Sequence, residues 1–513
     1  MPFISLTRMM ECLARDYPDK LALVCEDRRL TYGELNDRIN RLAHALLDKG
    51  IQKGDKVAVL NSNGVEMIES IYAVLKTGGV LVLLNSMVKG ESLRLMLDDS
   101  DSVALICGEA FTREVDSLKA GLPKIQPDHY ICTGSAEVPG YISYSHIMET
   151  CSGKNPEIPI FPEDLFNVIY SSGTTGLPKG IVHSHDHRCL FVWTYMREFI
   201  IHFESVICNS TPLYHNGSWV FVLPALFVGA TVVIMKKFHP KGFLELVEKE
   251  KVTHAYLVPT QYIALMEYPE FHSYDKSSLE VLLSLAAPLS RKTKEDILSN
   301  FSCRFFEMYG VTEGFSTILK PGDQRRKPGS VGKATLGSEL RVVDDHMKDV
   351  PVGEVGEIVG RGTLTPLGYY KKPELTAQTI VEGWLRTGDL GRLDEEGYLY
   401  LVGRKKDMIL SGGVNIYPED IEEVMMRHPK ILEVSVFGVP HEKWGETPWA
   451  AVVLKEGQEA TQEEILEWTN SRLARYQRIS GVDFMKELPR NPAGKVLKRE
   501  LRAPYWKGLE REI

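Results

Sequence analysis

Paired cysteines are missing from this sequence: its eight cysteines are scattered, and none forms a Cys-x-x-Cys pair. This pattern favours reduced thiols over a disulfide framework or a zinc site. An excess of positive charge is also missing, since 60 lysines and arginines stand against 69 aspartates and glutamates, a net charge of −9. Binding a phosphate backbone needs concentrated positive charge, so we expect no nucleic-acid partner.

Signals for export or lipid attachment are missing as well. The first residues, MPFISLTRMMECLARDYPDK, meet charge too early for a secretory signal, and the last, GLEREI, match no lipidation or peroxisomal signal. Together with the scattered cysteines, these absences predict a cytoplasmic protein. The sequence gives no indication of oligomeric state.

One charge-free run, WVFVLPALFVGATVVIM (219–235), approaches the length of a membrane span. Pro224 and the turn Gly229-Ala230-Thr231 divide this run into a short helix and a β-branched strand. We therefore expect a buried helix–strand pair and no integral membrane association.

Helical and strand patterns alternate through the first third of the 513 residues. The stretch 31–50 predicts an amphipathic helix, with Thr31 as N-cap, Glu34 three residues later and Gly50 as the stop. Runs typical of buried strands follow at 55–61 and 103–108, with a helical run between them. Strands separated in this way indicate βαβ units and a parallel sheet.

The composition changes after about residue 320. Residues 332–362 are rich in glycine and short strands, as expected of a small β-barrel-like subdomain. The final hundred or so residues alternate helix and strand in the manner of a small α+β domain. We predict an α/β protein in two domains: residues 1–405, with βαβ-type sheets and the barrel-like part, and a mobile α+β domain of residues 406–513.

The stretch YSSGTTGLPKG (170–180) is polar and rich in glycine, and it follows the strand-like run FNVIY. Backbone N–H groups and hydroxyls in such a loop can surround an anion, and Lys179 adds a positive charge. The spacing is not that of the usual P-loop, because Pro178 stands where a glycine is expected. From these residues alone, a phosphate loop and a flexible linker are both open.

SSGTTGLPKG closely resembles the signature loop of the adenylate-forming superfamily, which comprises acyl-CoA synthetases, peptide-synthetase adenylation domains and beetle luciferases. Further signatures of that family follow in order over nearly the whole chain: YHNG (214–217), SLAAP (284–288), YGVTE (309–313), RTGD (386–389), GRKKDMILSGGVNIYPEDIE (403–422) and PRNPAGK (489–495). The resemblance implies that a carboxylate attacks the α-phosphate of ATP, that pyrophosphate leaves, and that the thiol of coenzyme A then opens the acyl adenylate.

The resemblance also assigns the ATP site. It places the β- and γ-phosphates against Ser171, Ser172, Gly173, Thr174, Thr175 and Lys179, and the adenine against Ala286, Ala287, Pro288, Tyr309 and Gly310. It implies that Thr312 bonds the α-phosphate and that Glu313 holds Mg²⁺, for which a carboxylate oxygen is a suitable ligand. Asp389 is expected to accept hydrogen bonds from both ribose hydroxyls, with support from Arg404.

Lys495 is implied as the residue that carries adenylation. It lies far in sequence from the phosphate loop, so it reaches the reacting oxygens only when the small domain closes. Lys406 matches the hinge position, and rotation there presents Gly413 to the adenylate for the thiol step. Trp444 resembles an aromatic residue on the CoA side of some aryl-CoA ligases, although a core tryptophan is an equal interpretation.

Histidines near these motifs have two interpretations each. His215 lies where the family places a gating aromatic between the acyl pocket and the thiol tunnel; an inert loop histidine is the alternative. His183, His185 and His187 would share a face on a strand and could bind metal. Because the run follows the phosphate loop, we expect it to enter a helix, where that spacing separates them.

The function predicted is ATP-dependent acid–CoA ligation. The alternatives are a stand-alone enzyme that loads a carrier-protein thiol, a luciferase-type oxidation, and an inactive nucleotide-binding regulator. The expected acyl pocket, from 214–222, 284–287 and 309–317, has no obvious charge except Glu313. An apolar acid, whether aryl, alicyclic or medium-chain fatty, is favoured over a dicarboxylate, whose second charge would need a buried partner.

Overall fold

The structure is a computed structural model that describes residues 3–134, 136–171, 179–490 and 496–507. Backbone contacts divide the chain into two compact units. Unit 1 comprises Met1–Pro328, Ala334–Glu339 and Gly360–Leu385, and unit 2 comprises Gly329–Lys333, Leu340–Val359 and Arg386–Ile513. The predicted boundary near Lys406 remains a prediction.

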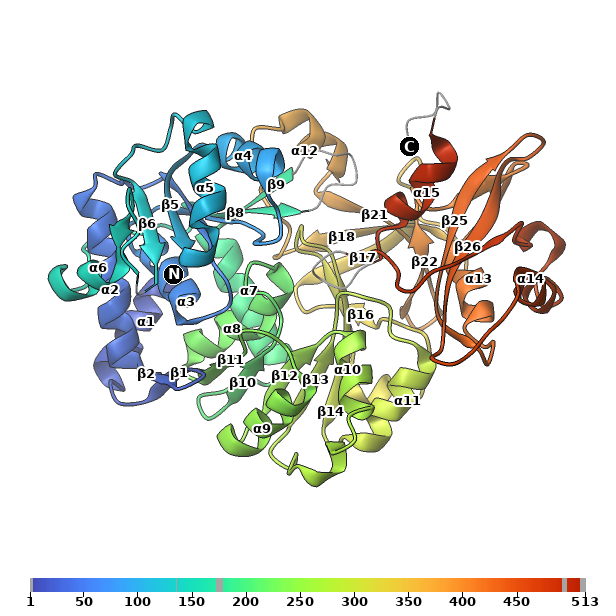
Figure 1. Ribbon diagram of the computed structural model, residues 1–513, viewed down its shortest axis with the longest axis horizontal. Helices are drawn as coiled ribbons and strands as arrows, with labels where there is room; N and C mark the ends of the chain where they lie inside the picture. The colour runs from blue at the N-terminus through green and yellow to red at the C-terminus, as the bar shows by residue number, and fades with distance from the viewer. Residues whose placement is uncertain (1–2, 135, 172–178, 491–495, 508–513) are drawn as a thin grey trace. The chain divides into compact units, whose positions relative to one another are not determined.

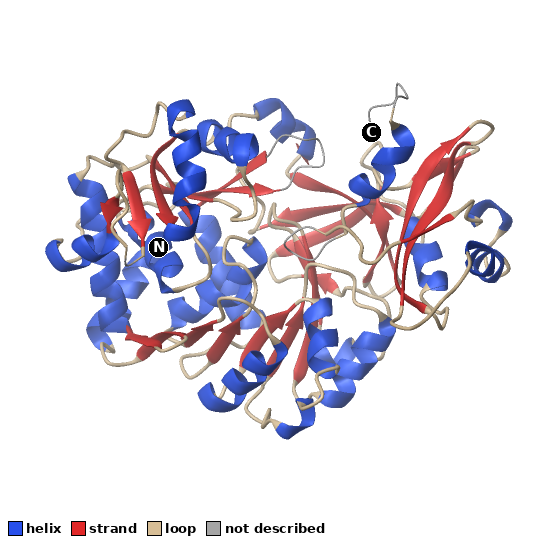
Figure 2. Cartoon of the chain, viewed as in Figure 1, coloured by secondary structure: helices blue, strands red, loops and turns tan. Residues whose placement is uncertain are grey.

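The first sheet of unit 1 has the strand order β19-β9-β8-β4-β3-β5-β6-β7 (Figures 1 and 2). Its strands from β8 to β7 pair in parallel, while β8, β9 and β19 pair antiparallel. Their bounds are β3 (Lys56–Leu60), β4 (Val80–Leu83), β5 (Ser102–Gly108), β6 (Tyr130–Thr133), β7 (Ile142–Ser143), β8 (Leu165–Ser171), β9 (Lys179–Ser184) and β19 (Gly368–Tyr369). The predicted βαβ units are therefore confirmed.

Helix α2 leads into β3 of this sheet, and α3 connects β3 with β4. Helix α2 (Tyr32–Asp48) begins with the predicted cap, because the Thr31 hydroxyl accepts from Glu34 N–H and the Glu34 carboxylate accepts from Thr31 N–H. Gly50 follows its end with a φ of 83°. Helix α3 (Val65–Lys76) is buried almost all round. The other helices around this sheet are α1 (Leu6–Asp16), α4 (Gly90–Asp99), α5 (Thr112–Leu118), α6 (Tyr144–Thr150) and α12 (Pro373–Thr379).

The second sheet runs in the order β16-β15-β14-β13-β12-β10-β11-β1-β2, where β16 is Lys333–Ala334. The strands from β14 to β1 pair in parallel, and β15 and β2 flank them antiparallel. The strands are β1 (Leu21–Cys25), β2 (Arg28–Thr31), β10 (Val206–Asn209), β11 (Thr231–Ile234), β12 (His254–Leu257), β13 (Val281–Ser284), β14 (Arg304–Gly310) and β15 (Ser316–Leu319). Figure 1 shows α9 (Pro240–Glu250), α10 (Pro259–Met266) and α11 (Arg291–Asn300) beside these strands.

Helices α7 (His185–Glu198) and α8 (Asn216–Val228) belong to the core of unit 1. One buried apolar cluster joins their side chains to α1, α2 and α3 and to strands of both sheets. The expected buried helix–strand pair is confirmed, but Pro224 takes no part in the division: α8 continues through this proline and ends at Val228, before Gly229, whose φ is 88°. The helix is buried on every side after its first two residues, so packing compensates for the hydrogen bond that proline removes. Strand β11 follows, as predicted.

Unit 2 includes most of a small sheet and a complete α+β part. The small sheet comprises β17 (Ser338–Val343), β18 (Gly356–Gly362), β21 (Trp384–Leu393) and β20 (Ile380–Val381), and β22 (Leu399–Arg404) pairs with β21. The α+β part contains β23 (Ile409–Ser411), β24 (Val414–Ile416), β25 (Ile431–His441), β26 (Gly445–Leu454) and β27 (Val482–Phe484). Helices α13 (Pro418–Met425) and α14 (Gln462–Asn470) lie beside the β25–β26 hairpin, and α15 (Lys498–Trp506) ends the described chain (Figure 1).

Among the helices that the structure describes, none is long and apolar enough to cross a bilayer.

Candidate functional site

The β8–β9 hairpin carries the predicted phosphate loop at its tip. Ser171, the last residue of β8, pairs with Lys179, the first residue of β9. The tip itself, with Ser172, Gly173, Thr174 and Thr175, lies outside the described residues. A phosphate bound by that loop would therefore meet the Lys179 end of β9.

Tyr309, Thr312 and Glu313 lie where β14 turns back into β15. Tyr309 and Gly310 pair with the start of β15, and Thr312 and Glu313 form the turn. Only glycine fits after them, because Gly314 has a φ of 109° and a Cβ there would stand 1.8 Å from the Leu364 carbonyl oxygen. The turn is therefore tight, and it holds the predicted adenine, α-phosphate and metal residues within five consecutive positions.

Tyr369 links this turn to the phosphate loop, and the sequence analysis missed it. Its hydroxyl donates to Glu313 Oε1 at 2.9 Å, and the centre of its ring lies 5.8 Å from Lys179 Nζ. Strand β19 brings it there by pairing with β9, where Tyr369 lies opposite Ile181. Burial and the Glu313 charge raise the pKa of Tyr369, so the phenol keeps its proton and donates it. Nothing in the run LGYY signals contacts with residues so distant in the sequence.

The Glu313 carboxylate suits a magnesium ion by its chemistry. Mg²⁺ prefers hard oxygen ligands and takes few carboxylates from the protein. The hydrogen bond from Tyr369 to one carboxylate oxygen fixes the orientation of the group.

The SLAAP loop follows β13 with strained backbone. Ala286 has a φ of 79°, a left-handed conformation that costs an alanine about 1–2 kcal/mol. Ala286 and Pro288 are exposed and Ala287 is half-buried. Such strain gathers at ligand sites, as expected of residues that flank an adenine.

His215 precedes the first residue of α8. Its Nε2 is buried without a hydrogen-bond partner among the described residues, and burial lowers its pKa to about 4. Two residues on, a Cβ added to Gly217 would lie 3.4 Å from Leu285 Cδ2, so the 214–217 and 284–287 segments lie side by side. Two of the three predicted acyl-pocket segments are therefore in contact, and His215 in one of them carries a neutral imidazole.

The three neighbouring histidines are separated, as expected. His183 lies on β9, and α7 begins at His185. The His183 ring bonds Asn167, the buried His185 ring packs against Phe166, and His187 Nδ1 bonds the Ser184 hydroxyl.

Asp389 and Arg404 lie opposite each other on β21 and β22 of unit 2. Arg404 Nε lies 3.0 Å from Asp389 Oδ1, and the Asp389 side chain is 9% exposed against 34% for Arg404. The pair brings together the two residues predicted for the ribose. Lys406 follows in an exposed turn.

The residues predicted for the thiol step lie farther along unit 2. Gly413 has a φ of 84°, so its backbone favours glycine even though a Cβ would meet nothing within 4 Å. Trp444 is 47% exposed, which excludes the core interpretation, and its carbonyl accepts from Gly412 N–H at 2.8 Å. Lys495 lies outside the described residues.

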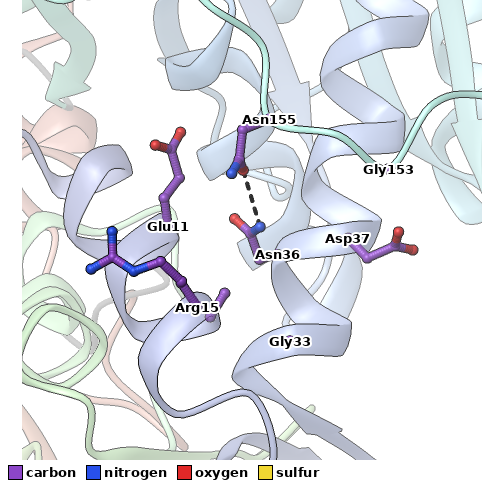
Figure 3. A pocket seen from close by; sticks show the side chains of 8 residues that line it. Glu11, Arg15, Gly33, Asn36, Asp37, Gly153 and Asn155 are labelled. Carbon is purple, nitrogen blue, oxygen red and sulfur yellow. Dashed lines mark hydrogen bonds between the residues drawn. The ribbon is translucent and has the colours of Figure 1, made fainter.

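A hollow of about 230 Å³ lies elsewhere in unit 1, among α1, α2 and residues 153–155 (Figure 3). Figure 3 shows Asn36 and Asn155 pointing toward each other, with Glu11 and Arg15 coming from α1. None of the predicted site residues lines it.

Comparison with known proteins adds to this geometry. A family model described as AMP-binding enzyme matches residues 11–370, and one described as AMP-binding enzyme C-terminal domain matches residues 420–495. The chain is 33% identical over 493 residues to the long-chain-fatty-acid–CoA ligase FadD13 of Mycobacterium tuberculosis, covering 93% of this chain and 94% of the relative. It is 34% identical to an indoleacetate–CoA ligase of Aromatoleum aromaticum, with 94% and 95% covered.

A solved structure is similar over almost its full length. The o-succinylbenzoate CoA synthetase of Bacillus subtilis, in complex with its acyl-adenylate intermediate, superposes with a TM-score of 0.86 at 28% identity, covering 96% of this chain and 97% of that one.

Proposed function

Since this chain belongs to the AMP-binding enzymes and is an acid–thiol ligase, we propose that it activates an acid of apolar carbon skeleton with ATP and transfers it to coenzyme A. In the first step a carboxylate oxygen attacks the α-phosphorus and pyrophosphate leaves. In the second, the CoA thiol loses its proton, its sulfur attacks the acyl carbon, and AMP leaves. The observation that carries the proposal is the contact of Tyr369 with both Glu313 and Lys179 at the predicted triphosphate site.

The ATP-binding roles follow the chemistry of each group. Lys179 and the loop before it hold the β- and γ-phosphates, Tyr309 lies against the adenine, and Thr312 donates to the α-phosphate. Asp389 accepts from the ribose hydroxyls while Arg404 holds its carboxylate in place. Glu313, oriented by Tyr369, would hold Mg²⁺, which neutralises phosphate charge when bound.

Lys495 donates to the oxygens at the reacting centre. We place it on a mobile domain that turns about Lys406, so that closure excludes water from the adenylate. The opposite face of that domain, with Gly413 and Trp444, serves the thiol.

The apolar skeleton follows from the side chains of the predicted acyl-pocket segments. Trp219, Phe221 and Leu285 of these segments are buried, and the His215 imidazole is neutral above pH 5 because burial lowers its pKa to about 4. Aryl, alicyclic and medium-chain fatty acids fit such walls, because burying their carbon skeleton is favourable.

Replacing Lys495 with alanine tests this proposal. We expect the exchange of labelled pyrophosphate into ATP, with an accepted acid present, to fall about 10²–10³-fold, because a preorganised charge contact at the reacting centre is lost. Lys507, an exposed lysine in the same part of the chain, gives the control Lys507→Ala, which keeps full exchange. Undiminished exchange in Lys495→Ala would refute the assignment.

A panel of carboxylic acids, scored by pyrophosphate release, identifies the substrate. Offering coenzyme A and a pantetheinylated carrier protein in parallel separates CoA ligation from carrier loading. Transfer to the carrier alone would replace the proposed acceptor.

A further inference from the structure

Arg188, in the first turn of α7, is one of the largest fully buried side chains, with 1% of its surface exposed. Its guanidinium donates from Nε to Asn167 Oδ1 at 2.8 Å, from Nη1 to Asn216 Oδ1 at 2.8 Å, and from Nη2 to His183 Nδ1 at 3.2 Å. All three acceptors are uncharged, since burial and Arg188 itself lower the pKa of His183 well below its ordinary value.

The positive charge of Arg188 has no counter-ion in the described chain. No Asp or Glu there forms an ion pair with it; it lies among three neutral acceptors and over the rings of Phe191 and Trp219. Burial lowers its pKa to about 9, which leaves the guanidinium charged at neutral pH. Buried charges are ordinarily paired, because removing an ion from water is costly.

The position of Arg188 separates it from the phosphates. His183 lies on the same face of β9 as Lys179 but four residues along the strand, a distance of about 13 Å. Between them the Ile169–Ile181 pair is buried. An anion beside Arg188 would therefore lie away from the Lys179 end of β9.

The same position adjoins the predicted acyl pocket. Asn216, which accepts from Arg188, follows His215 directly, and the guanidinium carbon lies 4.8 Å from the centre of the Trp219 ring. Both residues belong to the 214–222 segment that borders Leu285 through Gly217. The cation thus contacts the segment that is predicted to line the acyl pocket.

We propose that Arg188 binds a carboxylate at the end of the acid substrate remote from the reacting carboxylate. This rests on the proposed function and deepens it: the acid has an apolar middle and a second anionic end. A dicarboxylate was disfavoured from the sequence because its charge would need a buried partner, and Arg188 is such a partner. Its planar fork suits bidentate binding of a carboxylate.

The test compares diacids with their own half-esters, which keep the skeleton but mask the second charge. Suberic acid with monomethyl suberate, and para-phenylenediacetic acid with its monomethyl ester, are offered with ATP and CoA, and pyrophosphate release gives kcat/KM. We expect the wild type to prefer the diacid at least tenfold, and Arg188→Gln to lower this preference about 100-fold. Arg197→Gln, an exposed arginine on the same helix, leaves the preference unchanged.

A second variant keeps Arg188 and changes its surroundings. Asn216→Asp places a carboxylate at the same 2.8 Å contact and supplies a permanent counter-ion. We expect the midpoint of thermal unfolding without ligand to rise by a few degrees and the preference for diacids to disappear. Equal use of diacid and half-ester by the wild type, or an equal loss of both in Arg188→Gln, would overturn the proposal.

A binding measurement separates failure of this proposal from failure of the proposed function. If the wild type releases pyrophosphate with none of the acids offered, the proposed function fails. Thermal unfolding in the presence of suberic acid then still tests whether Arg188 binds an anion. A shift of about 2–4 °C in the wild type that is absent in Arg188→Gln supports the anion site, and no shift in either overturns it.

Discussion

Two buried cations in unit 1 are held by asparagine side chains, but among the described residues only one of them has a carboxylate nearby. Lys76, at the end of α3, is 3% exposed and lies 3.4 Å from Glu11 Oε1. Arg188 has a similar cage without a carboxylate. The Lys76 ammonium donates to the Oδ1 atoms of Asn36, Asn40 and Asn155 at 2.7, 2.7 and 2.8 Å.

The difference teaches that a cage of amides satisfies hydrogen bonds but does not balance a charge. The buried charge of Lys76 is relieved in two ways. The Glu11 carboxylate is near, and burial lowers the pKa of Lys76 to about 8, so the ammonium can lose a proton. The Arg188 guanidinium has no carboxylate beside it among the described residues, and it stays charged at neutral pH. Lys76 is therefore explained by structure alone, since it ties residue 155 to α2 and α3, whereas Arg188 calls for an anion from outside.

Glu11→Gln would turn the Lys76 cage into one like that of Arg188. We expect the free energy of unfolding at pH 7 to fall by about 1.4 kcal/mol, because a buried charge loses its partner. The pKa of Lys76 is about 8 with Glu11 present and falls further without it, so the penalty grows as the pH falls below 7 and disappears above pH 8, where the ammonium has lost its proton in both proteins. Urea unfolding at pH 7 and pH 10 measures both.

The control is Glu91→Gln, which breaks an exposed pair with Arg94 and changes stability by no more than about 0.5 kcal/mol. Equal losses in the two variants at pH 7 would show that the carboxylate of Glu11 does not distinguish the two cages.

Asp389→Asn tests a third cation, Arg404, whose partner is a carboxylate. The amide keeps the size of the side chain but loses the charge and one acceptor for the ribose. We expect kcat/KM for ATP to fall about 10–100-fold, the value of a hydrogen bond to a charged group. Initial-rate kinetics with varied ATP measure it.

Glu339→Gln, which removes a charge from the exposed pair with Arg361, is the matched control and leaves ATP kinetics unchanged. If Asp389→Asn behaves like this control, the pair holds the sheet together and does not bind the ribose.

His185→Phe tests whether a buried histidine in the first turn of α7 stays neutral, in contrast to the buried cation Arg188. Burial lowers the pKa of His185 to about 4 from 6.5, so protons bind the unfolded chain first. Stability is therefore lost as the pH falls from 6.5 to 4, by about 1.4 kcal/mol per pH unit for this histidine. Phenylalanine fills the same space beside Phe166, and we expect the variant to lack this part of the slope in thermal unfolding at different pH.

The control is His146→Gln, at an exposed position of α6, which leaves the buried His185 in place and keeps the acid slope of the wild type. A wild-type slope in His185→Phe would mean that this ring does not remain neutral in the fold.

Tyr369→Phe should have the smallest effect. The ring stays over Lys179, but Glu313 loses one hydrogen bond, so we expect the Mg²⁺ concentration for half-maximal activity to rise about 3–10-fold with kcat little changed. Tyr370→Phe is the control, because the Tyr370 hydroxyl bonds Asp101 instead. The same rise in both variants would argue against a role for Tyr369 in positioning Glu313.

Much of the fold could be predicted from local pattern. The capping box at Thr31 and Glu34 and the stop at Gly50 depend on neighbours in the chain, and the structure has all three. The same local reasoning failed at Pro224, where a break in the helix was expected. The burial of α8 outweighs the local cost of a proline.

The sequence predicted which chemical groups form the candidate site, but it did not predict which distant residues contact them. The motif around Glu313 named the residue, while its partner Tyr369 comes from a strand 56 positions later. Arg188 was overlooked for the same reason: its acceptors come from β8, β9 and α8, and no periodicity along α7 shows that these elements meet there.

By itself the sequence determined the order of helices and strands, the presence of an ATP-using site and the chemical groups available to it, since these depend on residue type and short-range spacing. Only the tertiary structure decided which distant groups meet: a tyrosine on the Glu313 carboxylate, a glutamate beside Lys76, and, within the part of the chain that the structure describes, no acid beside Arg188. The physical reason is that the cost of a buried charge depends on what surrounds it in space, and those surroundings come from segments far apart in the chain.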